Sequence, residues 1–356
     1  MRKMNTLDQA INNHFDWHPL RNNFFKERVI SAIRTGHIHY KKLVEYVSGD
    51  AKECSKNRQM QRFMQKQDID YTQAGKIVIE LLGLKDSFIL AMDRTNWKFG
   101  NKEINYLVIS VVYESTSIPL IWKELDKKGN SNTEERKGIV LDLLKIIDVN
   151  KIKILTGDRE FEGEELFKFL QENNIKYLVR LKSSHLLRHF NGEKMQAGKI
   201  FEYLSKNEIE SRKGKVLGVS SVIAVKKLKS GLLIACTNNL NLKEKEMLKS
   251  YKERWKIETL FKNTKTKYFN IEETHLKETK KLEKLLLIIT VACAISVLNG
   301  KIRNCLEKIK TKNHDRKLYS LLTYGIDFIK NNMSLERITR FKYVSYLLSF
   351  VIDLIG

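Results

Sequence analysis

Residues 251–265 read Tyr251-Lys-Glu-Arg254-Trp-Lys-Ile-Glu258-Thr-Leu-Phe-Lys-Asn-Thr-Lys265, and this stretch says more about the fold than any other. It contains neither Pro nor Gly, which favours one continuous helix. At about 100° and about 1.5 Å per residue, four polar side chains on that helix share a stripe roughly 60° wide and about 21 Å long. They are Tyr251, Arg254, Glu258 and Lys265.

An apolar face adjoins this stripe and suits burial against the rest of the protein. It consists of Ile257, Leu260, Phe261 and Thr264. One carboxylate among a phenol, a guanidinium and an ammonium, beside a buried face, suggests a metal site that handles a polyanion. A solvated pattern of i,i+4 charge pairs is the alternative for this stretch considered alone.

The composition points to a nucleic acid as partner. The 356 residues carry a formal net charge of +23, while 42% hydrophobic and 30% charged residues are ordinary for a globular protein of two or three folding units. Such an excess of Lys and Arg attracts polyanions. Acidic membrane surfaces are the competing explanation, but the basic residues are spread along the whole chain instead of forming one juxtamembrane cluster.

The cysteines and apolar segments favour a cytoplasmic protein that does not enter a membrane. No two cysteines have C-x-x-C spacing, so no zinc site is expected, and free thiols in a reducing compartment are the simplest reading. The N-terminus lacks the apolar core of a signal peptide. The longest apolar run, residues 285–298, is shorter than the roughly 20 residues that cross a bilayer and predicts a buried helix. The cysteines are Cys54, Cys236, Cys293 and Cys305.

Residues 1–85 read as a helical region. Apolar residues recur at helical spacing in four segments, 24–33, 40–47, 57–67 and 74–82. Arg58 and Arg62 lie on the third segment, which is compatible with a helical DNA-binding domain. Many small helical domains share this pattern, so the prediction depends on the rest of the chain.

From residue 87 the pattern changes to that of an α/β fold. Short β-prone runs and helical segments alternate in the order β-β-β-α-β-α-β. The expected strands are 87–93, 105–113, 117–125, 151–156 and 177–181, and the expected helices are 134–147 and 163–173. Pro119 restricts the third strand to an edge position or to its first residues. This order resembles an RNase H-like core with a mixed five-stranded sheet, which lacks only its closing helix.

The closing helix is expected only later, at residues 242–267. The intervening residues 183–237 read as turns and short strands and predict a β-rich insertion, so the core comprises residues 86–182 and 238–300. Residues 301–356 are expected to form a helical C-terminal region. Its apolar end, 343–355, either pairs two subunits or caps the core.

Three acidic residues stand where this core brings side chains together. Asp93 lies in the first strand, Asp158 follows the fourth, which is its neighbour in an RNase H-like sheet, and Glu258 lies on the closing helix. An isolated carboxylate in an apolar strand costs several kcal/mol, whereas clustered carboxylates bind hard divalent cations. Taken singly, Asp93 could instead cap a turn and Asp158 a helix. Glu160 competes with Asp158, which is preferred because it stands nearer the strand end.

Together these motifs resemble those of DDE transposases from bacterial insertion sequences, in the large group called insertion-sequence family four. Its signature is Tyr-x2-Arg-x3-Glu-x6-Lys, which all four residues of the polar stripe match without a gap. Asp93-Arg-Thr95 resembles the first acid motif of the family, and the Gly-Asp-Arg-Glu-Phe run at 157–161 resembles the second. The resemblance covers residues 85–300 strongly and the N-terminal helices loosely.

The resemblance implies roles for these residues. Asp93, Asp158 and Glu258 would bind two Mg²⁺ ions, with Mn²⁺ able to substitute. Tyr251, Arg254 and Lys265 would hold phosphates of the transposon end. Arg94 and Trp97, which follow the first acid, would line the DNA. Some relatives flip a base during hairpin formation, for which Trp97, Trp122 and Trp255 are the candidates.

The implied activity is cut-and-paste transposition by a homodimer that binds the terminal inverted repeats and target sites of double-stranded DNA in the bacterial nucleoid. Two alternatives stay open at this point. Another RNase H-like nuclease or resolvase needs the same acids but not the spacing of the polar stripe. A non-catalytic relative would bind DNA without cleaving it.

Overall fold

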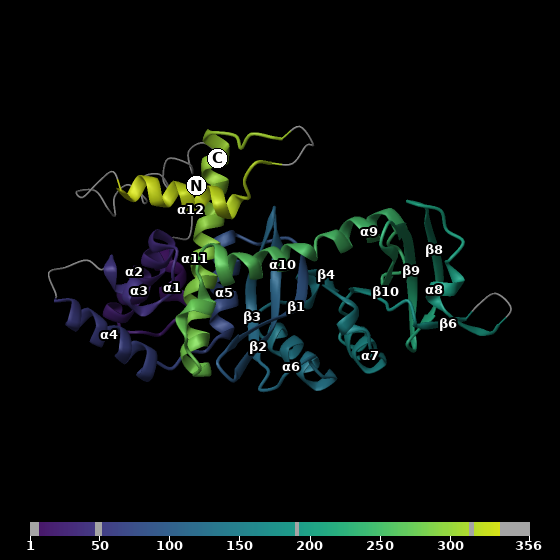
Figure 1. Ribbon diagram of the computed structural model, residues 1–356, viewed down its shortest axis with the longest axis horizontal. Coiled ribbons are helices and arrows are strands. Elements are labelled where there is room, and N and C mark those ends of the chain that lie inside the picture. Colours follow the sequence, from purple (N-terminus) through teal and green to yellow (C-terminus); the bar gives the residue numbers. More distant parts are fainter. Residues whose placement is uncertain (1–6, 47–51, 189–191, 313–316, 335–356) are drawn as a thin grey trace.

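A mixed eight-stranded sheet runs through the middle of the computed structural model, which describes residues 7–46, 52–188, 192–312 and 317–334 (Figure 1). The strand order is β3-β2-β1-β4-β5-β10-β9-β8. Its first part is an antiparallel meander of β1 (Phe88–Phe99), β2 (Lys102–Tyr113) and β3 (Thr116–Glu124). All three predicted strands are present, and β1 is longer than expected because it pairs with β2 as far as Phe99.

Pro119 lies within β3, which forms one edge of the sheet, as predicted. A proline cannot donate a backbone hydrogen bond, so an edge strand is where it disturbs the sheet least. The pairing of β2 with β3 shifts register between Ile109 and Ser110, where Ser110 faces Pro119. The irregularity thus coincides with the residue that lacks the donor.

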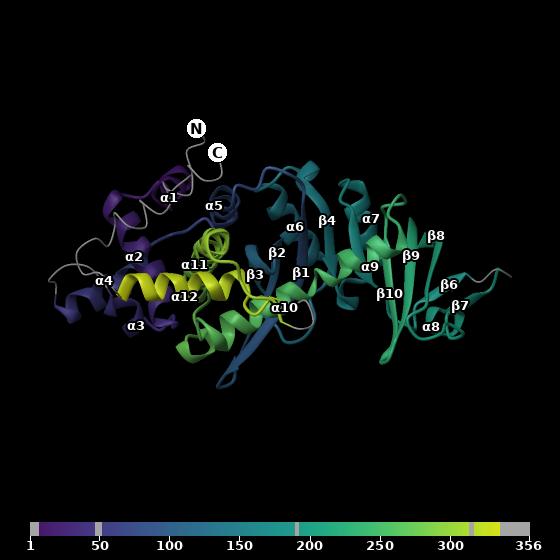
Figure 2. The same ribbon diagram turned by 90° about the horizontal axis from the view of Figure 1, so that it is seen from above.

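Two parallel strands continue the sheet beyond β1. β4 (Ile152–Gly157) pairs in parallel with β1, and β5 (Tyr177–Arg180) pairs in parallel with β4. The connections contain α6 (Thr133–Leu144) and α7 (Glu164–Glu172), close to their predicted positions. Figure 2 shows both helices on one face of the sheet.

The predicted five-stranded sheet is wrong in strand number. β10 (Gly231–Thr237) of the insertion pairs antiparallel with β5, and β9 (Val219–Leu228) and β8 (Ile209–Val216) follow it in the same sheet. The insertion is β-rich as expected, but it extends the central sheet because β5 would otherwise expose an unpaired edge. A hairpin of β6 (Leu186–Arg188) and β7 (Lys194–Gln196), with α8 (Ala197–Ile200), lies at the far end (Figure 1).

The predicted continuous helix over 242–267 is also wrong. α9 (Glu244–Lys252) and α10 (Trp255–Lys262) are separate, and residues Asn263–Lys267 form a π-helical segment. Between α9 and α10 the backbone N–H groups donate to the carbonyl three residues earlier instead of four, as from Arg254 N to Tyr251 O at 3.1 Å. The two helices cover different strands, α9 the insertion strands and α10 the meander, so packing and not a local breaker divides them.

Helices make up the other end of the molecule (Figure 1). The four predicted N-terminal segments correspond to α2–α5, and α1 was not predicted. Lys284, buried on α11, donates a 2.7 Å hydrogen bond to Met64 O in the last turn of α4 and so ties α4 to the core. The helices are α1 (Leu7–His14), α2 (Pro19–Thr35), α3 (Tyr40–Glu45), α4 (Glu53–Lys66), α5 (Thr72–Leu82), α11 (Thr279–Leu306) and α12 (Leu321–Ser334).

α11 is the predicted buried helix. It is long and apolar enough to cross a membrane, with a mean hydropathy of 2.1 over 18 residues, but 78% of that window is buried within the protein. α12 crosses α11 (Figures 1 and 2), which agrees with the predicted helical C-terminal region as far as residue 334. The apolar end at 343–355 lies outside the described residues.

Candidate active site

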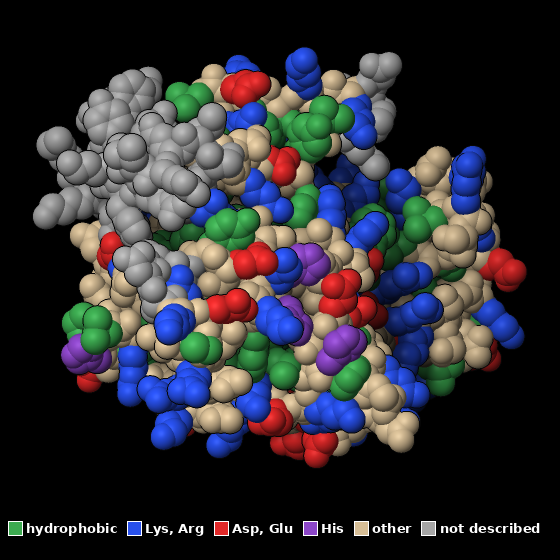
Figure 3. Space-filling view, turned by 60° about the vertical axis from the view of Figure 1, so that its left-hand side comes forward, with side chains coloured by type: hydrophobic (Ala, Val, Ile, Leu, Met, Phe, Trp, Pro, Cys, Tyr) green, Lys and Arg blue, Asp and Glu red, His purple; other side chains and the backbone are tan. Residues whose placement is uncertain are grey.

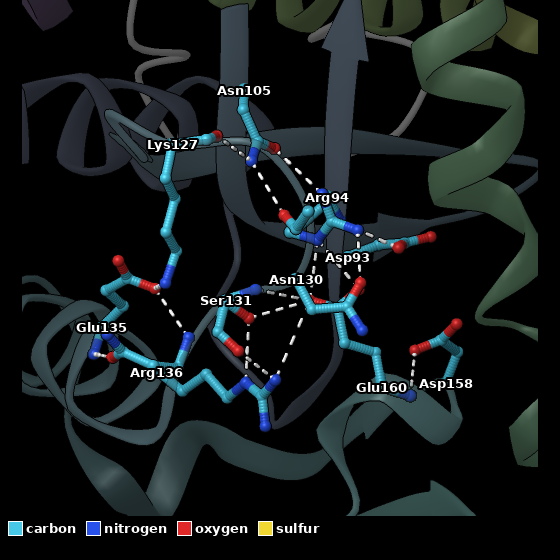
Figure 4. Close-up of polar contacts among 12 residues, drawn as sticks. Asp93, Arg94, Asn105, Lys127, Asn130, Ser131, Glu135, Arg136, Asp158 and Glu160 are labelled. Carbon is cyan, nitrogen blue, oxygen red and sulfur yellow. Dashed lines mark hydrogen bonds and ion pairs between the residues drawn. The ribbon is translucent and has the colours of Figure 1, made fainter.

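The sheet register brings Asp93 and Asp158 together. β1 and β4 run parallel with Met92 opposite Gly157, so Asp93 and Asp158 occupy the next level of the two neighbouring strands. Side chains alternate between the faces of a strand, and the face that carries these two also carries Ile89 and Ile154, which pack beneath α9. Figure 4 shows both aspartates, Asp93 on β1 and Asp158 just after β4.

Glu258 reaches the same point through Arg254. The Arg254 guanidinium lies 3.3 Å from Asp93 Oδ2 by Nη1 and 2.7 Å from Glu258 Oε1 by Nη2. The Arg254 side chain is only 8% exposed, whereas that of Glu258 is 54% exposed. Arg254 is therefore buried beside Asp93, whereas the Glu258 carboxylate is accessible to solvent and to a ligand.

The electrostatics of Asp93 suit a cation. Burial raises its pKa to about 7, and repulsion from Asp158 and Glu258 adds to the effect. The backbone N–H of Arg94, 2.8 Å from Asp93 Oδ1, and the Arg254 charge oppose this shift without cancelling it. Hard divalent cations prefer carboxylate oxygens, so the donor set fits Mg²⁺ or Mn²⁺.

This site is not closed around a metal. Within the described ranges, no three Asp, Glu, His or Cys side chains already form a group compact enough to hold a metal ion. The reason lies in the contacts above, because the Arg254 guanidinium fills the space between Asp93 and Glu258. Asp93 and Asp158 are in position for a cation, and Glu258 would join them after releasing Arg254.

Tyr251 and Lys265 do not share one continuous helix as predicted, since Tyr251 lies on α9 and Lys265 lies beyond α10. Tyr251 is buried against Ile154 and Leu178, and burial raises its pKa. Within the described part of the chain its hydroxyl makes no normal hydrogen bond, and neither does Arg254 Nε. Lys265 lies in the π-helical segment and donates a 2.6 Å hydrogen bond to Asn96 O of β1.

Glu160, the competitor of Asp158, is occupied by structural contacts. Its carboxylate accepts hydrogen bonds from Arg94 Nε at 2.7 and 2.8 Å and from Ser131 N and Oγ at 3.0 and 2.9 Å. Although burial alone would raise the pKa of Glu160, these bonds lower it. Asp158 is thus the better candidate. Arg94 is correspondingly a paired, largely buried side chain and not an open DNA-lining residue.

Arg180 belongs to this site but was not predicted. β5 pairs with β4 with Val179 opposite Gly157, so Arg180 occupies the level of Asp158 on the next strand. Arg180 is half-buried, and among the described residues its guanidinium donates one long hydrogen bond, 3.4 Å from Nη2 to Leu232 O. A basic residue at the end of a buried strand was the available signal, but only the register shows that it joins the acidic row.

The sequence matches the transposase DDE domain family over residues 84–295, which is more than half of the chain. The chain belongs to this family. The matched region of the transposase contains all three acids, the insertion and most of α11. A search of curated proteins finds no match.

Among solved structures, a cryo-EM synaptic complex of piggyBac transposase with hairpin DNA is similar to this transposase. The two chains share 14% identity with a TM-score of 0.46, over 92% of this chain and 74% of the other.

Two further predictions for the transposase concern its tryptophans. Trp97 is 7% exposed and stacks on Tyr106 with ring centroids 6.0 Å apart, so it is a core residue and not the predicted DNA contact. Trp122 is also buried, at 6% exposure. Trp255 is 48% exposed directly beside Arg254. Of the three candidates for base flipping, only Trp255 offers an accessible ring.

Arg58 and Arg62 of the transposase are exposed on α4, at the end of the molecule away from the acids (Figure 1). Arg62 lines a groove of about 540 Å³ between α2 and α4. Figure 3 shows this end of the surface, where Lys and Arg side chains are widely distributed and also line the hollow on the right. Other basic side chains of the groove are Arg21, Lys56 and Lys66.

The raised pKa of Asp93 predicts a pH-dependent stability. Its folded-state pKa of about 7 lies above the ordinary 3.8, so the folded protein binds more protons between these values and loses stability as pH rises through them. Without metal, Asp93→Asn should therefore gain stability over the wild type from pH 5 to pH 7 and level off above. Urea unfolding at pH 5, 6, 7 and 8 measures the difference. A difference that does not change with pH contradicts the assignment.

Proposed function

We propose that this transposase cleaves DNA at the ends of its element and joins them to target DNA, with Asp93, Asp158 and Glu258 as ligands of two divalent metal ions. The carrying observation is the parallel register that sets Asp93 level with Asp158, while Arg254 links Asp93 to Glu258. The order β3-β2-β1-β4-β5, antiparallel and then parallel, supports an RNase H-like core.

Asp93 is the natural shared ligand, because it stands between Asp158 on the next strand and Glu258 across Arg254. Asp93, Asp158 and Glu258 would hold the metal, which would supply activation of the attacking oxygen and neutralisation of charge on the leaving one. The protein supplies the neighbouring pair of aspartates and a solvent-exposed Glu258. Mg²⁺ is the expected ion, since the donors are all carboxylates.

The basic side chains beside the acids would hold the DNA phosphates. When Glu258 turns to a metal, Arg254 would keep its contact with Asp93, and its Nη2, which now bonds Glu258, would become available for a phosphate oxygen. Arg180, with one long contact, would approach the same strand from β5. The buried Tyr251 lies close to these basic groups. Lys265, which donates a hydrogen bond to Asn96 O of β1, would lie beside the bound DNA. This grouping, with its spacing, supports assignment to insertion-sequence family four.

The remaining surface would bind double-stranded DNA away from the acids. A net charge of +23 favours phosphate contacts that are independent of sequence. Arg58 and Arg62 on α4 would contact the terminal repeat, and two copies of the chain would pair the two ends in a homodimer. Trp255 is the side chain available to stack on an unpaired base.

The test is metal-dependent cleavage and strand transfer on duplexes that carry the inverted repeats flanking the gene. Asp158→Asn and Glu258→Gln should each lower cleavage at least about 10³-fold, or about 4 kcal/mol in barrier, with DNA binding retained. Glu253→Gln is the matched control, because Glu253 lies close in sequence but pairs with Lys256 outside the site.

Other outcomes identify other functions. Cleavage of generic branched duplexes without preference for the repeats would indicate a nuclease or resolvase. Binding without cleavage in Mg²⁺ or Mn²⁺ would indicate a non-catalytic relative. Wild-type activity in both acid variants would contradict the proposed metal site.

A further inference from the structure

We propose that the Arg94–Glu160 ion pair is a positioning element that fixes the relative placement of Asp93 and Asp158 and thereby sets the affinity of the site for divalent metal. The inference rests on the proposed function, because it assumes that these two aspartates are metal ligands. Neither Arg94 nor Glu160 would touch the metal, and their effect would pass through the aspartates.

The first observation is that each aspartate is hydrogen-bonded by the backbone of one member of the pair. Arg94 N donates to Asp93 Oδ1 at 2.8 Å, and Glu160 N donates to Asp158 Oδ1 at 2.8 Å. The side chains of Arg94 and Glu160 then join the middle of β1 to the turn after β4, with Arg94 Nε 2.7 and 2.8 Å from the two carboxylate oxygens (Figure 4). A shift of either partner would therefore turn the aspartate beside it.

The second observation is that the surroundings hold the pair rigidly. Arg94 also donates to Asn105 Oδ1 at 3.0 Å and to Asn130 Oδ1 at 2.9 Å, which are supplied by β2 and by the loop before α6. Ser131 donates to Glu160 from both N and Oγ. The side chains of Arg94 and Glu160 are 16% and 10% exposed, so water competes little for these bonds.

These bonds also exclude direct roles for the pair. Glu160 directs its carboxylate at Arg94 and Ser131, which leaves it poorly placed to bind a metal. All three nitrogens of the Arg94 guanidinium donate to protein acceptors, which leaves little capacity to bind a DNA phosphate. Groups that orient metal ligands in this way typically change metal affinity about 10- to 100-fold when they are altered.

The test measures Mn²⁺ binding to the folded protein by electron paramagnetic resonance of the free ion, which needs no catalytic turnover. Arg94→Lys keeps the charge but cannot bond both oxygens and the two asparagines, and Glu160→Gln keeps the shape but removes the charge. Each should weaken Mn²⁺ binding about 10- to 100-fold. The double variant should bind Mn²⁺ no more weakly than the single variant with the larger loss of affinity, because the two residues act as one unit.

The matched control is the Arg212–Glu210 pair of β8, which has the same 2.7 Å contact outside the site. Arg212→Lys and Glu210→Gln should leave Mn²⁺ binding unchanged. Thermal unfolding identifies any variant that does not fold. Ser131→Ala then provides a milder test with an intermediate loss, because it removes one of the bonds to Glu160, together with the bond from Arg136 Nε to Ser131 Oγ, and leaves the Arg94–Glu160 contact in place. High Mn²⁺ should restore cleavage in the folded Arg94 and Glu160 variants, which a general loss of stability would not allow.

Three results would overturn the positioning role, and they distinguish its failure from the failure of the proposed metal site. Folded Arg94 and Glu160 variants with wild-type Mn²⁺ affinity overturn the positioning role and leave the proposed function intact. Equal losses in the control pair overturn it as well. If the wild type itself shows no Mn²⁺ binding that Asp93→Asn removes, the proposed metal site fails, and the positioning role fails with it.

Discussion

Asp93→Asn is expected to lower DNA cleavage by the transposase at least about 10³-fold, which corresponds to about 4 kcal/mol of lost transition-state stabilisation. Asp93 stands between Asp158 and Glu258, so its loss would remove the carboxylate that the proposed metal ions would share. Asparagine has nearly the same shape, and Arg94 N can still donate to its Oδ1. The fold and the affinity for DNA should therefore be unchanged.

Cleavage of a labelled transposon end in Mg²⁺, beside a mobility-shift measurement of binding, checks this result. Asp142→Asn is the control, since Asp142 pairs with Lys145 on the exposed side of α6. The control should cleave like the wild type. Cleavage by Asp93→Asn within tenfold of the wild type would show that Asp93 is not a metal ligand, and a parallel loss of DNA binding would point to misfolding.

Gly325→Ala is expected to destabilise the protein by at least about 3 kcal/mol or to detach α12 from α11. A Cβ atom at residue 325 would lie 1.6 Å from Ser296 O and 2.7 Å from Gly300 N, where backbone meets backbone and no side chain can move aside. The two helices would have to separate. Separation would expose buried Leu322 and Ile326, each worth about 1.5–3 kcal/mol.

Gly138→Ala is the matched control, because Gly138 also lies within a helix but meets only the flexible end of Lys123, at 3.3 Å. There alanine should be neutral or stabilise the protein by up to about 1 kcal/mol. Chemical unfolding of both variants measures the contrast, and limited proteolysis reports whether α12 is released. Equal stabilities for the two variants would mean that α11 and α12 do not cross as closely as described.

Much of the fold was predictable because hydrophobic periodicity is a local property. The strands around Asp93 and Asp158 and the helices at 133–144 and 164–172 follow from residues close in sequence. The edge position of Pro119 follows from its missing N–H. The partners of each strand are not local, so the pairing of β10 with β5 could not be read from either segment.

The same distinction explains the predictions that were wrong. The segment 242–267 has no Pro or Gly, and it divides only because α9 and α10 pack on different strands. Trp97 follows the first acid motif and lies on the same face of β1 as Asp93, but the fold buries it beside Tyr106. Arg94 looked available for DNA until the fold brought Glu160 to it.

The sequence by itself determined which residue types this transposase has for its chemistry and on which kind of element each lies. It did so because element type depends on spacing within a few turns of chain. Only the tertiary structure favours Asp158 over Glu160 as a candidate ligand, sets Arg180 level with Asp158 and pairs Arg94 with Glu160. Those outcomes depend on register and on contacts between residues some 66 positions apart, which no local pattern encodes.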